Sequence, residues 1–354
     1  MSTAIPKTAK TGNRTKSKLD SVLEEIADRH NLTINRESCQ NIASAGFYRD
    51  NLALAIVATD LLFCEKPCTL RGLLYQVVSA GWLPSTDRQH YARLGRLVTR
   101  LREAGVVPFD WIVDGVRSTD KPSSWSGLAD FAEAVRDSYR LDFWARLPHY
   151  IHFIVEKDAI AGTLSPITRK YDVALSPLRG YSSLSFAHEI AQTWNQIEKP
   201  IFCYYLGDFD ASGFDLQRDI REKLRRYCEH NYWFGDGHDA DEGPEHDDYY
   251  REALGKNNVF FRRIAVVESD FDDFNLLPLA VKHSDTRARK FLELHGDQCA
   301  ELDAIPSNEL RRRVESIIES HIDVARDEWE RLQRVEEIER ETLDGFIENL
   351  GGAA

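Results

Sequence analysis

Two aspartates separated by one residue, Asp208 and Asp210, directly follow a short apolar run in the chain. The run, Ile201–Leu206, is typical of a strand buried on both faces. Residues i and i+2 of an extended backbone point the same way, so we expect both carboxylates at the strand's carboxyl end, where open α/β sheets bind ligands. This arrangement suits Mg²⁺, because the ion takes one or two carboxylates and keeps positions open for phosphate oxygens.

A structural interpretation of the same pair is also open. Ser212 and Gly213 form a tight exit before a segment with helical periodicity, so one aspartate can cap that helix while the other is solvated. A second stretch favours the metal. The β-rich run Tyr150–Val155 ends directly on Glu156, which places another carboxylate at a strand end.

This layout resembles the Toprim domain, in which a glutamate closes one buried strand and Asp-x-Asp closes a later one. A third strand, expected over Arg263–Glu268, and the segment 269–278 after it resemble the topoisomerase VI A subunit. Residues Ala300–Ile305 are similar to that family's Ala-Glu-Ile-Glu-Ala-Leu. The resemblance covers roughly residues 60–310 and implies Mg²⁺ held by Glu156, Asp208 and Asp210.

The same family carries an arginine, usually an aspartate, two apolar residues and then the tyrosine that attacks DNA. Arg71 and Tyr75 match this pattern, whereas Gly72 departs from the common aspartate. A tyrosine is a poor nucleophile at neutral pH, and an arginine four residues earlier lies on the same helical face, where it can stabilise the phenolate and the phosphate. The resemblance implies that Tyr75 is the nucleophile, although the residue taken alone is typical of a core aromatic.

A basic segment precedes the acidic strand ends. Helices expected over Thr69–Ala80 and Asp87–Ala104, then a strand over Val107–Val113, outline a winged helix, whose second helix enters the major groove. Arg93, Arg96 and Arg100 fall on one face of that second helix, opposite an apolar face made by Leu94, Leu97, Val98 and Leu101. An ordinary solvated helix usually mixes charge signs, so we expect this face to contact DNA.

Composition places limits on the class of protein. The 354 residues are 42% hydrophobic and 29% charged, as in an ordinary globular protein. No apolar run approaches the roughly 20 residues that span a bilayer, no secretory signal is recognisable, and six scattered cysteines indicate reduced thiols. The net charge of −13 argues against nucleic-acid binding by the whole surface, so we expect a localised DNA-binding face and a cytoplasmic, nucleoid-associated location.

The predicted fold class is multidomain α/β, with a helical winged-helix module before a Rossmann-like Toprim domain. The predicted parts are a disordered basic arm (1–18), the helical and winged-helix domain (19–117), a linker helix (118–148), the Toprim domain (149–306) with an acidic insertion (228–258), and C-terminal helices (307–354).

The function that we predict is Mg²⁺-dependent double-strand cleavage of DNA by tyrosine transesterification. Lys157 and Arg179 are further candidates for contact with DNA, although Lys157 can instead pair with Asp158 and Arg179 can belong to a plain turn. The resemblance implies a homodimer and allows a separate ATPase subunit. Two alternatives stay open: a Toprim nuclease that hydrolyses DNA without the tyrosine, and a winged-helix regulator without catalysis.

Overall fold

A computed structural model describes residues 17–113, 123–180, 184–229, 232–234, 258–281 and 287–351. The chain divides into two compact units, each made of two separate stretches: residues 1–64 and 76–111 form unit 1, and residues 65–75 and 112–354 form unit 2. Most of the basic arm predicted over 1–18 and of the acidic insertion predicted over 228–258 lies outside the described residues. No helix in the described ranges is long and apolar enough to cross a membrane.

Unit 1 is helical. Its helices are α1 (Lys18–Ala27), α2 (Arg36–Ser44), α3 (Arg49–Glu65, of which the last residue belongs to unit 2), the end of α4 (Leu70–Ser79), α5 (Arg88–Glu103) and the 3-10 turn η1 (Phe109–Trp111). The predicted apolar face of α5 is confirmed, because its four leucine and valine side chains are buried. Asp87 caps α5 by accepting a hydrogen bond from the His90 N–H.

Unit 2 is built on a five-stranded parallel sheet with the order β4-β3-β5-β7-β6. The strands are β3 (Tyr150–Val155), β4 (Ala174–Pro177), β5 (Ile201–Leu206), β6 (Tyr232–Phe234) and β7 (Asn258–Ala265). Helices α7 (Asp158–Lys170), α8 (Leu184–Asn195) and α9 (Ala211–Tyr227) follow β3, β4 and β5. A parallel sheet requires such crossovers between neighbouring strands.

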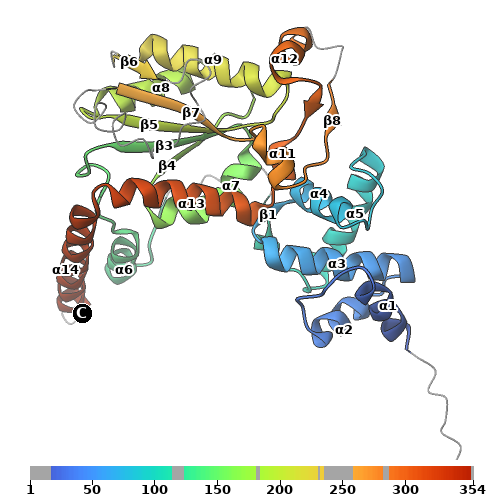
Figure 1. Ribbon diagram of the computed structural model, residues 1–354. Helices are drawn as coiled ribbons and strands as arrows, with labels where there is room; N and C mark the ends of the chain where they lie inside the picture. The colour runs from blue at the N-terminus through green and yellow to red at the C-terminus, as the bar shows by residue number, and fades with distance from the viewer. Residues whose placement is uncertain are drawn as a thin grey trace, which may run out of the picture. The chain divides into compact units, whose positions relative to one another are not determined.

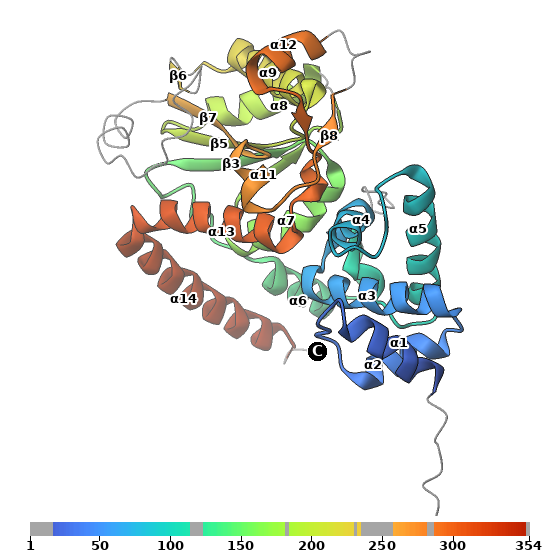
Figure 2. The same cartoon turned by 45° about the vertical axis from the view of Figure 1, so that its right-hand side comes forward.

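The helices cover both faces of this sheet: α8 and α9 lie on one face, and α7 and α13 (Ser307–Asp323) lie on the other (Figures 1 and 2). Side chains alternate between the two faces, as the two-residue period of a strand requires. Phe153 of β3 and Tyr204 of β5 join the core beneath α7 and α13, whereas Ile154 and Cys203 join the core beneath α8 and α9. The central strands are therefore buried on both sides.

Smaller elements complete unit 2. They are β1 (Cys68–Thr69), which pairs in parallel with β2 (Ile112–Val113), α6 (Leu128–Ser138), α11 (Ser269–Asp273), β8 (Leu279–Ala280), which pairs antiparallel with β9 (Gln298–Cys299), α12 (Ala288–His295), η2 (Leu302–Ala304) and α14 (Arg326–Gly351). The mixed α/β class with parallel strands is confirmed. The winged-helix and Toprim assignments stay predictions.

Two strand predictions are wrong in their bounds. Of the strand expected over Val107–Val113, only Ile112–Val113 forms, because only these two residues pair with a neighbouring strand, while η1 occupies most of the remainder. The third strand, expected over Arg263–Glu268, instead runs from Asn258 to Ala265. At its end, the Gly207 N–H donates to the Ala265 carbonyl and the Val266 N–H donates to the Gly207 carbonyl, at 2.8 Å each.

Candidate active site

The candidate acids lie beside the point where the strand order of the sheet reverses. From β3 the chain passes through α7 to β4 on one side, and then through α8 to β5 on the other side of β3. In open α/β sheets, the crevice at the carboxyl ends of two such strands is the usual ligand site. Glu156 follows β3 and Asp208 follows β5 by one glycine, so the structure brings them together there: the Asp208 N–H donates to Glu156 Oε2 at 2.8 Å.

The two aspartates of the pair have different surroundings. Asp208 is 9% exposed, and its Oδ1 accepts a hydrogen bond from the Leu302 N–H at 2.8 Å. Asp210 caps α9, because its Oδ1 accepts from the Gly213 N–H at 2.7 Å. The capping interpretation is therefore confirmed for Asp210, whereas Asp208 is buried rather than solvated. The residue between them, Phe209, is buried and bonded through its backbone to Ala300.

Two glycines allow this turn to pack closely. A Cβ atom added to Gly213 would lie 2.2 Å from the carbonyl oxygen of Asp208. A Cβ atom added to Gly207 would lie 2.6 Å from the Tyr205 ring and 2.9 Å from Glu156 Oε2. Any larger residue at either place would push the acids apart, so these glycines are part of the site's construction.

Arg263 of β7 supports the turn that contains Gly207 and Asp208. Its guanidinium donates to the carbonyl oxygens of Gly207, at 2.7 Å, and of Asp208. It also donates to the Val266 carbonyl and to Gln217 Oε1, both at 2.8 Å, and lies 4.3 Å from the centre of the Phe214 ring. A planar group with five N–H donors can hold several carbonyls in one geometry, so Arg263 fixes the backbone from which Asp208 projects.

Lys157, next to Glu156, turns inward to a group of carboxylates. Its ammonium lies 2.8 Å from Asp208 Oδ1, 2.9 Å from Asp303 Oδ2 and 3.4 Å from Glu301 Oε2. The alternative pairing of Lys157 with Asp158 does not form, because Asp158 pairs with Arg179 at 2.7 Å. The charges that surround Lys157 raise its pKa against the opposing effect of burial. Lys157 is therefore a fixed internal cation in this structure.

The acids that face each other here repel. Burial and the neighbouring Asp208 carboxylate raise the pKa of Glu156 to about 7, and Asp210 acts in the same direction. Burial also raises the pKa of Asp208, although the Lys157 ammonium opposes this rise. Carboxyl groups of raised pKa at the ends of neighbouring strands are typical of functional sites.

Tyr75 belongs to unit 2 and is close enough to this charge network to respond to it. Burial and Glu301 raise the pKa of Tyr75, whereas Arg71 and Lys157 act in the opposite direction. Arg71 itself pairs with Glu301 at 3.1 Å. The side chain of Tyr75 is only 2% exposed, so the predicted nucleophile is covered in this conformation.

The departure at Gly72 has a local explanation. The Thr69 hydroxyl oxygen accepts a hydrogen bond from the Gly72 N–H at 2.8 Å, so Thr69 caps α4, and the hydroxyl donates to Asp303. A Cβ atom at Gly72 would lie 3.3 Å from Thr69 Oγ1 and 3.4 Å from the Asp303 carbonyl oxygen. An aspartate at position 72 would therefore place a second carboxylate close to Asp303, in a space that fits glycine.

The donor chemistry of the acids fits Mg²⁺ better than a softer metal, because all the candidate ligands are carboxylate oxygens. Within the described ranges, no three histidine, cysteine, aspartate or glutamate side chains are arranged to enclose a metal ion. Mg²⁺ needs only one or two carboxylates and keeps several waters, so Glu156 and Asp208, with Asp210 beside them, form an acceptable donor set.

The three arginines of α5 are placed differently from one another. Arg93 donates to Asn51 Oδ1 through two nitrogens, at 2.8 and 3.2 Å. Arg100 donates to the Gly46 carbonyl at 3.1 Å and stacks over Phe47. Arg96 is exposed. The predicted face exists, but part of its hydrogen-bonding capacity is used inside unit 1.

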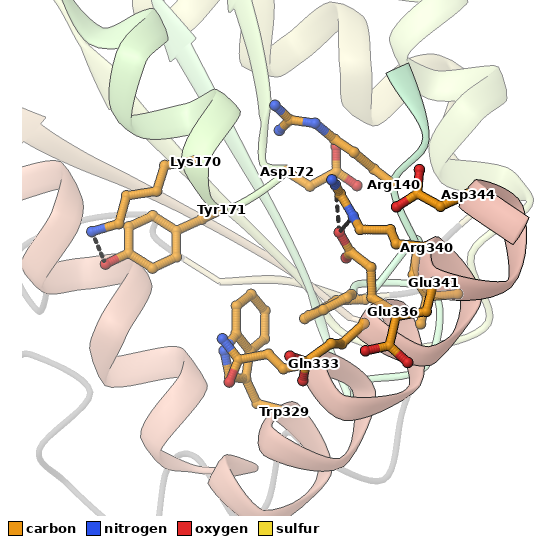
Figure 3. Close-up of a pocket in the computed structure, with 13 residues that line it drawn as sticks. Arg140, Lys170, Tyr171, Asp172, Trp329, Gln333, Glu336, Arg340, Glu341 and Asp344 are labelled. Atoms are coloured by element: carbon orange, nitrogen blue, oxygen red, sulfur yellow. Dashed lines mark hydrogen bonds and ion pairs between the residues drawn. The ribbon is translucent and has the colours of Figure 1, made fainter. Parts of the chain in front are cut away.

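A separate cavity of about 650 Å³ lies between α14, residues 140–143 ahead of β3, and residues 170–172 at the C-terminal end of α7 (Figure 3). Trp329 and Tyr171 contribute aromatic surface, and Arg340 pairs with Glu336 one turn away on α14. The acidic cluster, by which we mean Glu156, Asp208, Asp210, Glu301 and Asp303, contributes no residue to the lining of this cavity. The candidate chemistry and this cavity are therefore in different places of unit 2.

No protein-family model matches the chain, and a search of curated proteins finds no match. The assignment of the site therefore rests on the geometry described above. Sequence reasoning missed three of its members, Arg263, Glu301 and Asp303. The last two lie in the segment Ala300–Ile305, whose resemblance to a family motif was a usable signal, but nothing in the sequence places their carboxylates beside Lys157.

Proposed function

We propose that the protein cleaves DNA in a Mg²⁺-dependent reaction at the carboxyl ends of β3 and β5. The observation that carries this proposal is the pair of buried acids, Glu156 and Asp208, on the two strands that flank the reversal in strand order. Burial, together with the repulsion from Asp208, raises the pKa of Glu156 to about 7, and a divalent cation relieves this repulsion. A structural role alone does not require acids to be buried side by side.

Each residue has a role in this proposal. Glu156 and Asp208 would hold the ion with Asp210, and Arg263 keeps their backbone in place. A bound Mg²⁺ supplies positive charge for the phosphate oxygens, whose negative charge increases in the transition state. Positioning and charge are the main sources of catalysis in phosphoryl transfer, so the rigid backbone around Asp208 suits this chemistry.

Tyr75 is the nucleophile in the first form of the proposal. Its phenolate oxygen forms a bond to phosphorus, the bond from phosphorus to one deoxyribose oxygen breaks, and that oxygen takes up a proton. Two cations of unit 2, Arg71 and Lys157, act to lower the pKa of the phenol, which supports this role. Because Tyr75 is covered here, attack requires a rearrangement that exposes it, for example when a DNA duplex binds to a homodimer.

Hydrolysis is the second form, and the burial of Tyr75 favours it. A phenol that is 2% exposed, with its pKa raised by that burial, is a poor nucleophile. A water molecule held near Glu156 would then attack phosphorus and release free DNA ends. The exposed Arg96 and its neighbours on α5 would bind duplex DNA in both forms.

The decisive experiment compares wild type with Tyr75→Phe on supercoiled plasmid in Mg²⁺, stopped with denaturant. The first form predicts that wild type leaves protein covalently attached to DNA and that Tyr75→Phe does not cleave. Normal cleavage by Tyr75→Phe, with free ends, would establish hydrolysis. A folded wild type that cuts no duplex under any divalent ion would contradict both forms.

A further inference from the structure

The ammonium of Lys157 occupies a place that resembles a cation site. Carboxylate oxygens of Asp208, Asp303 and Glu301 approach it at 2.8, 2.9 and 3.4 Å. These acids come from the turn after β5 and from the segment around η2, so the fold assembles them from distant parts of the chain. A single positive charge therefore has three acidic neighbours.

Asp208 connects this place with the proposed metal site. Its Oδ1 faces Lys157, while its backbone N–H is bonded to Glu156. Asp208 is therefore in contact with Glu156 through its backbone and, through the Lys157 ammonium, with Glu301 and Asp303. Enzymes that use two metal ions hold them about 3.5–4 Å apart on one phosphate, and the second cation next to Asp208 here is the Lys157 ammonium.

The acids around Lys157 are themselves held in position. The Thr69 hydroxyl donates to Asp303, and Arg71 pairs with Glu301 at 3.1 Å. Asp303 is 4% exposed, and the side chain of Lys157 is 27% exposed. The ammonium is therefore part of a network that is largely shielded from water, and it is not a mobile surface charge.

We propose that Lys157 takes the place of a second metal ion, so that each chain binds one divalent cation, at Glu156, Asp208 and Asp210. This inference rests on the proposed function, because it assigns the cation count of the same site. A covalently attached ammonium supplies one fixed charge without having to be captured from solution. It also holds Asp208 Oδ1 at 2.8 Å and links it, through Glu301, to Arg71.

The test counts Mn²⁺ ions bound per chain, by calorimetry and by electron paramagnetic resonance, in the full-length protein without DNA. Wild type is expected to bind one ion. Lys157→Met removes the charge but keeps much of the side chain's bulk, and we expect it to bind two ions with a spin-coupled spectrum. Lys170→Met is the matched control, because Lys170 pairs with Glu315 outside the cluster; it should bind one ion.

Loss of Lys157 leaves its acidic neighbours without a counter-charge, which can prevent folding. The double variant Lys157→Met/Glu301→Gln has less repulsion and still offers Asp208 and Asp303, so it should also bind two ions. Two ions in wild type, or one ion in both Lys157 variants, would overturn the inference while leaving the proposed cleavage intact. A wild type that binds no Mn²⁺ would overturn the inference and the proposed function together.

Discussion

The acidic cluster of unit 2 and the arginine face of unit 1 hold charge in opposite ways. In the cluster, Asp208 is 9% exposed and has fixed partners on several sides. On α5, Arg96 is exposed, whereas the flanking Arg93 and Arg100 donate to residues of their own unit. Buried charge is costly and must be matched in place, whereas exposed charge is cheap and free to meet a partner. The first region suits chemistry and the second suits binding.

The largest expected effect concerns the buried acids. Asp208→Asn should lower Mg²⁺-dependent DNA cleavage by roughly 10³-fold, because it weakens charge stabilisation worth several kcal/mol. The measurement is the rate of plasmid cleavage at saturating Mg²⁺. Asp219→Asn, in which an aspartate of α9 that pairs with Lys223 is changed, should cut like wild type. Equal rates for both variants would remove Asp208 from the site.

Arg263 offers a direct comparison of a partly buried arginine with an exposed one. Arg263→Met leaves the carbonyls of Gly207 and Asp208 without their donor, so it should lower the free energy of unfolding by about 3 kcal/mol. Arg218→Met breaks exposed pairs within α9 and should cost at most about 1 kcal/mol. Urea denaturation measures both. Similar losses would mean that burial does not distinguish the two arginines.

Protons should compete with Mg²⁺ for the Glu156 carboxylate. Because the pKa of Glu156 is raised to about 7, Mg²⁺ affinity should fall by up to about tenfold per pH unit below pH 7. Calorimetric titration between pH 5.5 and 8.5 measures it. Glu156→Gln should bind more weakly throughout and lose this dependence. A wild-type affinity that is flat across the range would contradict the assignment of Glu156.

The raised pKa of Glu156 also affects stability. As pH rises it makes Mg²⁺ binding stronger, but it makes the metal-free folded state less stable. The folded state holds the Glu156 proton more tightly than the unfolded chain, so the contribution of this group is favourable at low pH and is lost as pH rises from about 4.5 through 7. Without metal, Glu156→Gln should therefore become more stable relative to wild type above pH 7. Melting temperatures recorded against pH test this, and a difference that does not change with pH would refute it.

The smallest effect belongs to the exposed arginines. Replacing Arg93, Arg96 and Arg100 by glutamine should weaken duplex binding and reduce the salt slope by up to about three phosphate contacts. Because Arg93 and Arg100 already have partners in unit 1, Arg96→Gln should give the largest single effect. Arg36→Gln, whose arginine pairs with Asp20 in the same unit, is the control. An unchanged salt slope would mean that DNA binds elsewhere.

Local patterns predicted much of this molecule. The bounds of β3 and β5 follow from apolar runs that a parallel sheet buries on both faces, and the stripe of α5 follows from helical spacing. The placement of Glu156 and Asp208 at strand ends follows from the same runs. These features depend on near neighbours in the chain, which a sequence contains directly.

Other features depend on distant partners. The ammonium of Lys157 is held by acids 144 and 146 residues further along the chain, and no local rule chooses these over the adjacent Asp158. The strand expected at 107–113 is short because a strand exists only where a neighbour pairs with it. In the sequence, Arg263 is an ordinary strand residue, and only the folded chain brings the Gly207 turn next to it.

The membership of residues 65–75 in unit 2 has a consequence during synthesis. Thr69 finds its partner Asp303 across a separation of 234 residues, and a ribosome that adds about 5–20 residues per second needs roughly 12 to 47 s to cover that distance. Unit 1 lies wholly before residue 112 and can begin to form in this time. The segment that carries Arg71 and Tyr75 must wait, so we expect it to be the last part of the N-terminal third to become ordered on the nascent chain.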